Sequence, residues 1–255
     1  MTSDKKIAVA VRSLEKTFEG RKVLEDITLE VYSGETFVIM GGSGSGKSTL
    51  LRIMAGGIIA DAGQVFFGDK EISRLNEDEK DSIKRRFGMC FQSAALLDSL
   101  SVEQNVSLPL REHTKLTSKV ISIIAKMKLN LVGLQGFEYY LPSMLSGGMR
   151  KRAGLARAIA MDPEIVFYDE PTAGLDPIMC AVIDKLILDL TKKLNLTSIV
   201  VTHNMESVFR IADRVAMLYR GKLLEVGTQE QIRNSKNAII QQFIKGEIEG
   251  PIQIT

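Results

Sequence analysis

The most informative segment of this sequence is Gly41-Gly42-Ser43-Gly44-Ser45-Gly46-Lys47-Ser48-Thr49. A short apolar run, Thr36 to Met40, precedes it, and an apolar pattern with helical spacing, residues 50–54, follows it. A strand, a loop of the form G-x-x-x-x-G-K-[ST] and a helix together predict a phosphate-binding loop. The alternative is a flexible Gly/Ser turn, and the flanking elements argue against it.

The chemistry of this loop follows from its residue types. Glycines let the backbone wrap an anion and direct N–H groups inward, and the following helix presents its positive end. Lys47 is placed to reach the β- and γ-phosphates, and the Ser48 hydroxyl to ligate Mg²⁺. The predicted ATP-binding residues of the loop are Gly41, Gly42, Ser43, Gly44, Ser45, Gly46, Lys47, Ser48 and Thr49.

A second signal is an apolar run, residues 165–168, that ends in Asp169 and Glu170. In a parallel sheet, ligands bind at the carboxyl ends of the strands. Asp169 is therefore placed to support Mg²⁺, and Glu170 to orient or deprotonate an attacking water. Taken alone, the pair could equally be a solvated acidic turn before Pro171.

The wider pattern predicts an α/β protein. Alternating segments near residues 7–11 and 27–31 predict strands, and further strands are expected at 165–168, 198–201 and 215–226. Residues 94–140 are mainly helical in pattern, with one apolar side formed by Val120, Ile121, Ile123, Ile124 and Met127. Strands that alternate with helices predict a mostly parallel sheet with crossovers.

Composition excludes several classes of protein. With 45% hydrophobic residues and a net charge of +2, the chain is neither a disordered acidic chain nor a strongly basic nucleic-acid binder. No apolar run reaches the roughly 18 residues that a membrane span needs. The two cysteines, Cys90 and Cys180, do not make a disulfide framework.

A third signal is the segment Leu145-Ser146-Gly147-Gly148-Met149, which precedes a helical run. Two glycines at a helix start expose N–H groups to an anion. The basic run Arg150-Lys151-Arg152 that follows is interpreted as a solvated face, and a role near phosphates is the alternative.

Taken in order, these motifs resemble the nucleotide-binding subunit of ATP-binding-cassette (ABC) transporters, over about residues 7–230. The resemblance implies a P-loop NTPase cassette with a RecA-like mixed sheet lobe, an N-terminal antiparallel β subdomain and a helical signature lobe. It places the ATP-binding domain at residues 1–235, the helical lobe at about 92–159 and a C-terminal tail at 236–255.

The same resemblance implies roles for single residues. Phe18 would stack on adenine, with a core or hairpin position as its alternative. Gln92 would ligate Mg²⁺ together with Ser48 and Asp169, and would sense the membrane partner. His203 would contact the γ-phosphate, so that the catalytic set is Glu170, His203 and Lys47.

Two chains of such a family face each other head to tail and enclose two ATP molecules. Ser146, Gly147, Gly148 and Met149 would then bind the γ-phosphate held by the other subunit. Asp176 would communicate between the subunits, although it could equally cap the helix after Pro177. The clamp closes on ATP and opens after hydrolysis, because some contacts exist only in the closed state.

Three segments, residues 92–114, 145–160 and 242–251, look like the ATPases of the Mla (maintenance of lipid asymmetry) phospholipid transporters. This resemblance implies a homodimer, a membrane permease, a lipid-binding protein with an MCE domain and a peripheral site on the cytoplasmic side of a bacterial inner membrane. In some bacteria a small STAS-domain protein also binds the ATPase.

Three other functions remain open at this point. The chain could be an importer ATPase for a small polar solute, a mechanical clamp on DNA or ribosomes, or a nucleotide-binding regulator without hydrolysis. The near-neutral charge and the short interval between Gln92 and Leu145 disfavour the clamp. The presence of Glu170 and His203 disfavours the regulator.

Overall fold

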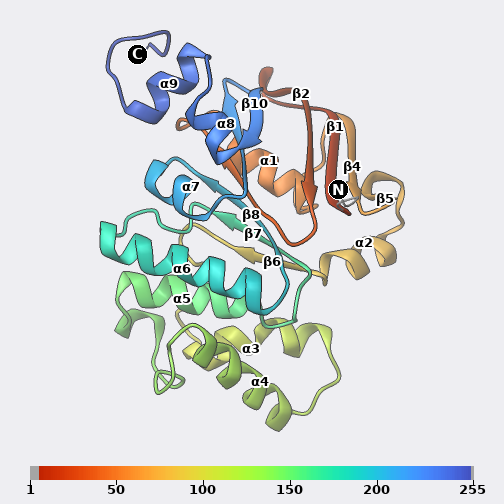
Figure 1. The fold of residues 1–255 in the computed structure, drawn as a ribbon. Coiled ribbons are helices and arrows are strands. Elements are labelled where there is room, and N and C mark those ends of the chain that lie inside the picture. The colour runs from red at the N-terminus through yellow and green to blue at the C-terminus, as the bar shows by residue number, and fades with distance from the viewer. Residues whose placement is uncertain (1–5, 254–255) are drawn as a thin grey trace. The chain divides into compact units, whose positions relative to one another are not determined.

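A computed structural model describes residues 6–253, and its contacts divide the chain into two compact units (Figure 1). Unit 1 contains the described residues of Met1–Leu75 and Ile199–Thr255, and unit 2 is Asn76–Ser198. The predicted tail, 236–255, lies in unit 1 and extends two residues beyond the described range.

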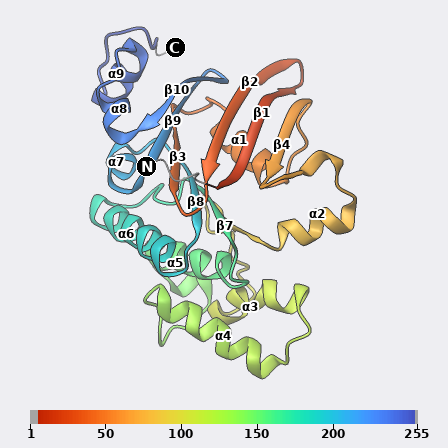
Figure 2. The same ribbon diagram turned by 45° about the vertical axis from the view of Figure 1, so that its right-hand side comes forward.

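Unit 1 contains a four-stranded antiparallel sheet in the order β2 (Arg21–Tyr32), β1 (Ile7–Phe18), β4 (Ala62–Phe67) and β5 (Lys70–Glu71). Figure 2 shows β2, β1 and β4 side by side. Every second residue of the 27–31 segment is buried, because successive side chains of a strand point to opposite faces. The 3₁₀ turn η1 (Ile72–Arg74) follows β5. This sheet confirms the predicted antiparallel subdomain.

Unit 1 also contains strands of a second, mixed sheet. The fully buried β3 (Thr36–Met40) pairs in parallel with β9 (Arg214–Tyr219), which pairs antiparallel with β10 (Lys222–Thr228). The helices of the unit are α1 (Lys47–Met54), α7 (Met205–Ile211), α8 (Gln229–Arg233) and α9 (Ala238–Lys245). In the sequence, β8 (Thr197–Thr202) crosses from unit 2 into unit 1, and all its residues are buried.

Unit 2 combines two parallel strands with helices. Strand β6 (Phe87–Cys90) pairs with β7 (Ile165–Asp169), and Cys90 lies opposite Tyr168. The helices are α2 (Glu77–Lys84), α3 (Val102–His113), α4 (Ser118–Leu131), α5 (Gly147–Ala158) and α6 (Pro177–Lys193), with the 3₁₀ turn η2 (Pro142–Met144) before α5. Helices α3, α4 and α5 pack together and confirm the predicted helical lobe.

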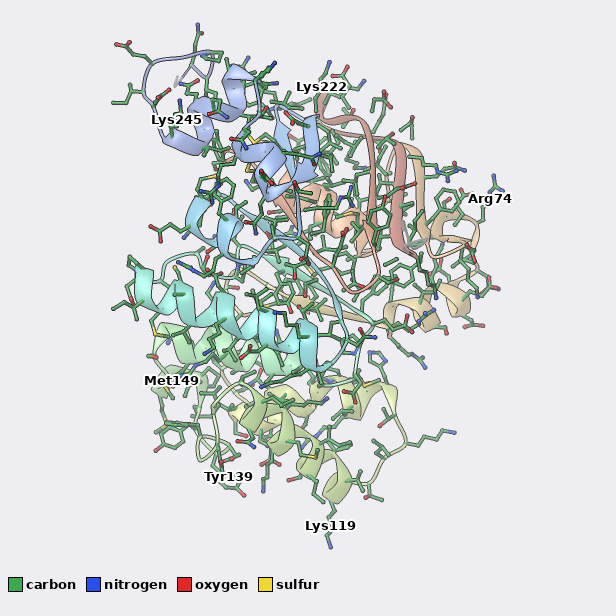
Figure 3. All side chains as sticks on the ribbon, viewed as in Figure 1. Arg74, Lys119, Tyr139, Met149, Lys222 and Lys245 are labelled. Carbon is green, nitrogen blue, oxygen red and sulfur yellow. The ribbon has the colours of Figure 1, made fainter. Side chains whose placement is uncertain are left out.

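Helix α4 corrects one expectation about its apolar side. Its buried apolar positions are Ile121, Ala125 and Leu129, spaced four residues apart. Of the expected apolar set, Val120, Ile123 and Met127 are exposed. The prediction of one continuous apolar side was therefore wrong, because a helix advances about 100° per residue and the expected set spans too wide an arc. Figure 3 shows Lys119, at the start of α4, pointing away from the helix bundle.

Among residues 6–253, no helix combines the length and the apolar character that crossing a bilayer requires.

Candidate nucleotide-binding and hydrolysis site

The phosphate-binding loop joins β3 to α1 in unit 1, and its shape depends on two glycines. The backbone φ is +156° at Gly41 and +104° at Gly46. A Cβ at Gly41 would lie 2.2 Å from the Leu218 carbonyl oxygen, and one at Gly46 would lie 2.9 Å from the Val23 carbonyl oxygen. Neighbouring backbone therefore leaves no room for a side chain at either position.

The interior of the loop carries groups that suit a phosphate. The Lys47 Nζ atom is 2.9 Å from the Gly41 carbonyl oxygen and 3.0 Å from that of Gly42, and the side chain is buried. The Ser45 hydroxyl is buried without a hydrogen-bond partner among the described residues. Since buried polar groups are nearly always paired, an enclosed cation beside an unpaired hydroxyl fits an anionic ligand.

The turn between β9 and β10 is hydrogen-bonded to the phosphate-binding loop. The Gly221 N–H donates to the Ser45 carbonyl at 3.1 Å, and the Glu25 N–H donates to the Gly221 carbonyl at 2.8 Å. Leu218 and Gly221 thus shape the site, although sequence reasoning did not select them. The only signal for them was the turn pattern Arg220-Gly221 in a predicted hairpin.

Two further predicted residues lie in unit 1 with the loop. Phe18 ends β1 with 43% of its surface exposed, and the Lys16 ammonium lies 5.0 Å from its ring centroid. Asp61 holds Lys16 at 2.7 Å, and this hydrogen bond lowers the pKa of the Asp61 carboxyl. His203 directly follows β8, and its side chain is exposed.

Unit 2 brings the predicted acidic residues and Gln92 to one edge. Asp169 ends β7 and is 2% exposed; Glu170 follows at 7% exposed with a φ of +47°. Since Cys90 and Tyr168 are opposite each other on parallel strands, Gln92 and Glu170 each come two residues after a paired position. The Gln92 side chain is exposed there.

The segment 145–149 starts helix α5. Ser146 is the N-cap, and its hydroxyl accepts a hydrogen bond from the Met149 N–H at 3.3 Å. Ser146 and Gly147 are exposed, while Gly148 is buried, where an added Cβ would lie 2.3 Å from the Met179 Cε. Figure 3 labels Met149 beside this end of α5. Ser146 and Gly147 at the start of α5 are thus exposed to solvent.

Asp176 has the capping role that was the alternative for it. Its Oδ1 atom accepts hydrogen bonds from the N–H groups of Ile178 and Met179, both at 3.0 Å. Pro177 occupies the first helical position of α6, which suits its fixed φ. This cap leaves the predicted communication between subunits as a separate hypothesis.

The basic run after Met149 is not one solvated face. Lys151 is 8% exposed, and its ammonium donates to the main-chain carbonyls of Gln92 and Glu170. The expectation of a surface role was therefore wrong for this residue, because its helical phase turns it inward. The sequence does contain a signal that α5 is a closely packed helix, namely its small residues Ala153, Gly154, Ala156 and Ala158.

The candidate Mg²⁺ ligands offer hydroxyl, amide and carboxylate oxygens, the donor types that Mg²⁺ prefers. Ser48 lies in unit 1, whereas Gln92 and Asp169 lie in unit 2. Within residues 6–253, no group of three or more His, Cys, Asp or Glu side chains could hold a metal ion. These oxygen types suit a cation that also binds phosphate oxygens.

A glycine-shaped loop with an enclosed lysine and a buried strand that ends in two acids define a P-loop nucleotide hydrolase. Residues 24–173 match the family described as ABC transporter. The chain belongs to that family, as an ATPase. ATPases of this family bind ATP and act as dimers with a membrane permease.

Individual relatives agree with the predicted resemblance to Mla ATPases, which is confirmed. The intermembrane phospholipid transport system ATP-binding protein MlaF of Haemophilus influenzae is 43% identical over 245 residues, covering 96% of this chain and 93% of that protein. The probable ribonucleotide transport ATP-binding protein mkl of Mycobacterium leprae is 39% identical over 246 residues, covering 96% of this chain and 71% of that protein.

A solved structure shares the fold. The dimeric, post-hydrolysis ATP-binding cassette MJ0796, bound to ADP and Pi, has a TM-score of 0.79 and 30% identity, covering 86% of this chain and 98% of that one.

Proposed function

We propose that this chain is the ATPase subunit of a bacterial complex that drives phospholipid transport between the inner and outer membranes. The observation that carries the proposal is the 43% identity to the MlaF protein of Haemophilus influenzae over 96% of this chain. A match of that extent includes the phosphate-binding loop, the acidic strand end and the α5 start in one continuous alignment.

ATP binding is assigned mainly to unit 1. Lys47 and the loop N–H groups hold the β- and γ-phosphates, and Phe18 stacks on adenine. The exposed Phe18 ring and the buried ammonium support these roles. Ser48, Gln92 and Asp169 would hold Mg²⁺, which neutralises phosphate charge when it is bound.

Hydrolysis is assigned to Glu170, which orients or deprotonates the attacking water, with His203 on the γ-phosphate. Ser146, Gly147, Gly148 and Met149 contribute from the second subunit of a homodimer. The exposed Ser146 and Gly147 at a helix N-terminus support that contribution, because unpaired N–H groups there attract an anion. Asp176 joins the two subunits in this scheme.

The proposed complex includes a membrane permease and an MCE-domain lipid-binding protein, and a STAS-domain protein in some bacteria. The ATPase then lies on the cytoplasmic side of the inner membrane as a peripheral subunit. A net charge of +2 is compatible with a subunit that binds protein partners and not nucleic acid.

Purification from membranes tests the assignment. A tagged chain is expected to recover a permease and an MCE-domain protein, with phospholipid detected by mass spectrometry. In that complex, Glu170→Gln is expected to bind ATP and lose turnover, while Lys47→Ala loses ATP affinity. Unchanged turnover in Glu170→Gln would remove the role assigned to Glu170.

A second candidate is transport of a small polar solute. It is favoured by the 39% identity to mkl of Mycobacterium leprae, which is described as a probable ribonucleotide transport protein. The same purification separates the two candidates, because this function requires a soluble solute-binding partner in place of an MCE-domain protein. ATPase stimulation by ribonucleotides, and not by phospholipid, would favour the second candidate.

A further inference from the structure

One buried cation of unit 2 is not used by the scheme above. Lys151 lies in the second turn of α5, and its Nζ atom donates to the main-chain oxygen of Gln92 and, at 3.4 Å, to that of Glu170. Its side chain lies among those of Cys90, Leu155 and Tyr168. The residue therefore joins α5 to the ends of β6 and β7.

The two acceptors occupy equivalent places. Strands β6 and β7 are parallel with Cys90 opposite Tyr168, so both accepting residues come two positions beyond a matched pair. Glu170 has a φ of +47°, a left-handed conformation that costs a non-glycine residue free energy unless its surroundings hold it. A hydrogen bond to its carbonyl is one such restraint on the turn.

The same face of α5 packs against the segment that begins at Gln92. A Cβ on Gly154 would lie 3.0 Å from the Ala94 Cβ, so the helix backbone approaches closely there. The Arg157 guanidinium donates to the Ala94 and Ala95 carbonyls, each at 2.6 Å. Positions 151, 154 and 157 are three apart, so they share one side of the helix.

Stability alone does not explain a lysine here. Lys151 is only 8% exposed, so its ammonium has given up most of its hydration. Apolar residues of similar volume often replace buried ionic groups at no cost in stability. What an apolar side chain cannot do is fix two carbonyl oxygens.

We propose that Lys151 is a positioning residue for ATP hydrolysis: it fixes the backbone of Gln92 and Glu170 relative to the helix that begins with Ser146. The inference rests on the proposed roles of Gln92 and Glu170. Lys151 itself touches neither nucleotide nor water in this scheme. Its loss is therefore expected to lower kcat and to leave ATP affinity unchanged.

The test uses full-length chain in the complex purified from membranes. We expect Lys151→Met to lower kcat about tenfold, with the KM for ATP within twofold, and Lys151→Arg, which keeps the charge and the donors, to recover most of the turnover. Arg152→Met is the matched control, because Arg152 is the next cation on α5 and donates to the Gly133 carbonyl at 3.1 Å. It is expected to retain the kcat of the unsubstituted complex.

Melting temperatures separate positioning from folding. The inference holds if kcat falls in Lys151→Met while its melting temperature stays near that of the unsubstituted chain. It is overturned if kcat is unchanged, if Arg fails to rescue, or if the loss of turnover follows a loss of stability equally in Lys151→Met and Arg152→Met. Glu170→Gln, measured beside them, tests the proposed function separately: normal turnover there removes the role of Glu170, whatever Lys151 does.

Discussion

Two glycines of the phosphate-binding loop give a matched test of how its shape is maintained. Gly41 and Gly44 both have positive φ, +156° and +73°, and they lie six and three residues before Lys47 in the loop. A Cβ at Gly41 would lie 2.2 Å from the Leu218 carbonyl oxygen, whereas one at Gly44 would meet nothing within 4 Å. Alanine should therefore have unequal effects at the two positions.

The expected size of the difference follows from these distances. A carbon and a carbonyl oxygen approach to about 3.3 Å, so Gly41→Ala needs a separation about 1 Å larger than the backbone provides. Leu218 is held in β9 by pairing with Leu223, so it cannot retreat without breaking the sheet. We expect a loss of about 3 kcal/mol or more for Gly41→Ala, and of about 1 kcal/mol for Gly44→Ala from φ alone.

Thermal denaturation and ATP binding measure the two effects. A loss of about 3 kcal/mol corresponds to a fall of roughly 6–12 °C in melting temperature, and 1 kcal/mol to about 2–4 °C. Gly41→Ala should also lower the affinity for ATP. The added Cβ shifts the loop backbone, and this displaces the loop N–H groups that are proposed to hold the phosphates. Equal stability and equal affinity in the two variants would refute the argument that Leu218 shapes the loop.

Three further perturbations test other parts of the structure. Arg214→Met should lower the free energy of unfolding, measured with urea, by about 3 kcal/mol, because the buried Glu35 carboxylate loses the Arg214 guanidinium that lies 3.1 Å away. A decrease below about 1 kcal/mol would contradict this expectation. Burial raises the pKa of the Cys90 thiol from 9.0 to about 11. The unfolded chain therefore loses that proton first, and stability should fall by about 3 kcal/mol between pH 9 and 11, relative to Cys90→Ala. Gly148→Ala should destabilise by about 1 kcal/mol, since its Cβ would lie 2.3 Å from the Met179 Cε, and a Met179→Ala background should remove that penalty in a double-mutant cycle.

The sequence was most informative where one local pattern determines the geometry. The loop at residues 41–49 predicted its flanking strand and helix, and the alternation at 27–31 predicted strand β2. Both patterns depend on neighbouring residues alone, since glycine sets φ and alternation sets which side faces the core. The mixed sheet was anticipated from the family resemblance, and the β3–β9 and β9–β10 pairings bear it out.

The sequence was least informative where distant segments meet. Nothing near residue 41 indicates that the Leu218 carbonyl lies against it, because that contact depends on the pairing of β3 with β9. Helix α4 shows the same limit: its apolar residues cover more than one face, and only packing against α3 and α5 decides that Ile121 is buried and Ile123 exposed.

The run Arg150-Lys151-Arg152 shows why composition cannot replace geometry. Consecutive helix residues point about 100° apart, so three adjacent cations reach three different places. Arg150 donates to the Leu145 carbonyl at 2.7 Å, Lys151 to Gln92, and Arg152 to the Gly133 carbonyl at 3.1 Å. Each binds main-chain oxygen, yet only the middle one is buried against the strand ends that carry the proposed hydrolytic residues. Helical phase, and not charge, therefore selects Lys151, and a variant that moves the lysine to position 150 or 152 should not replace it.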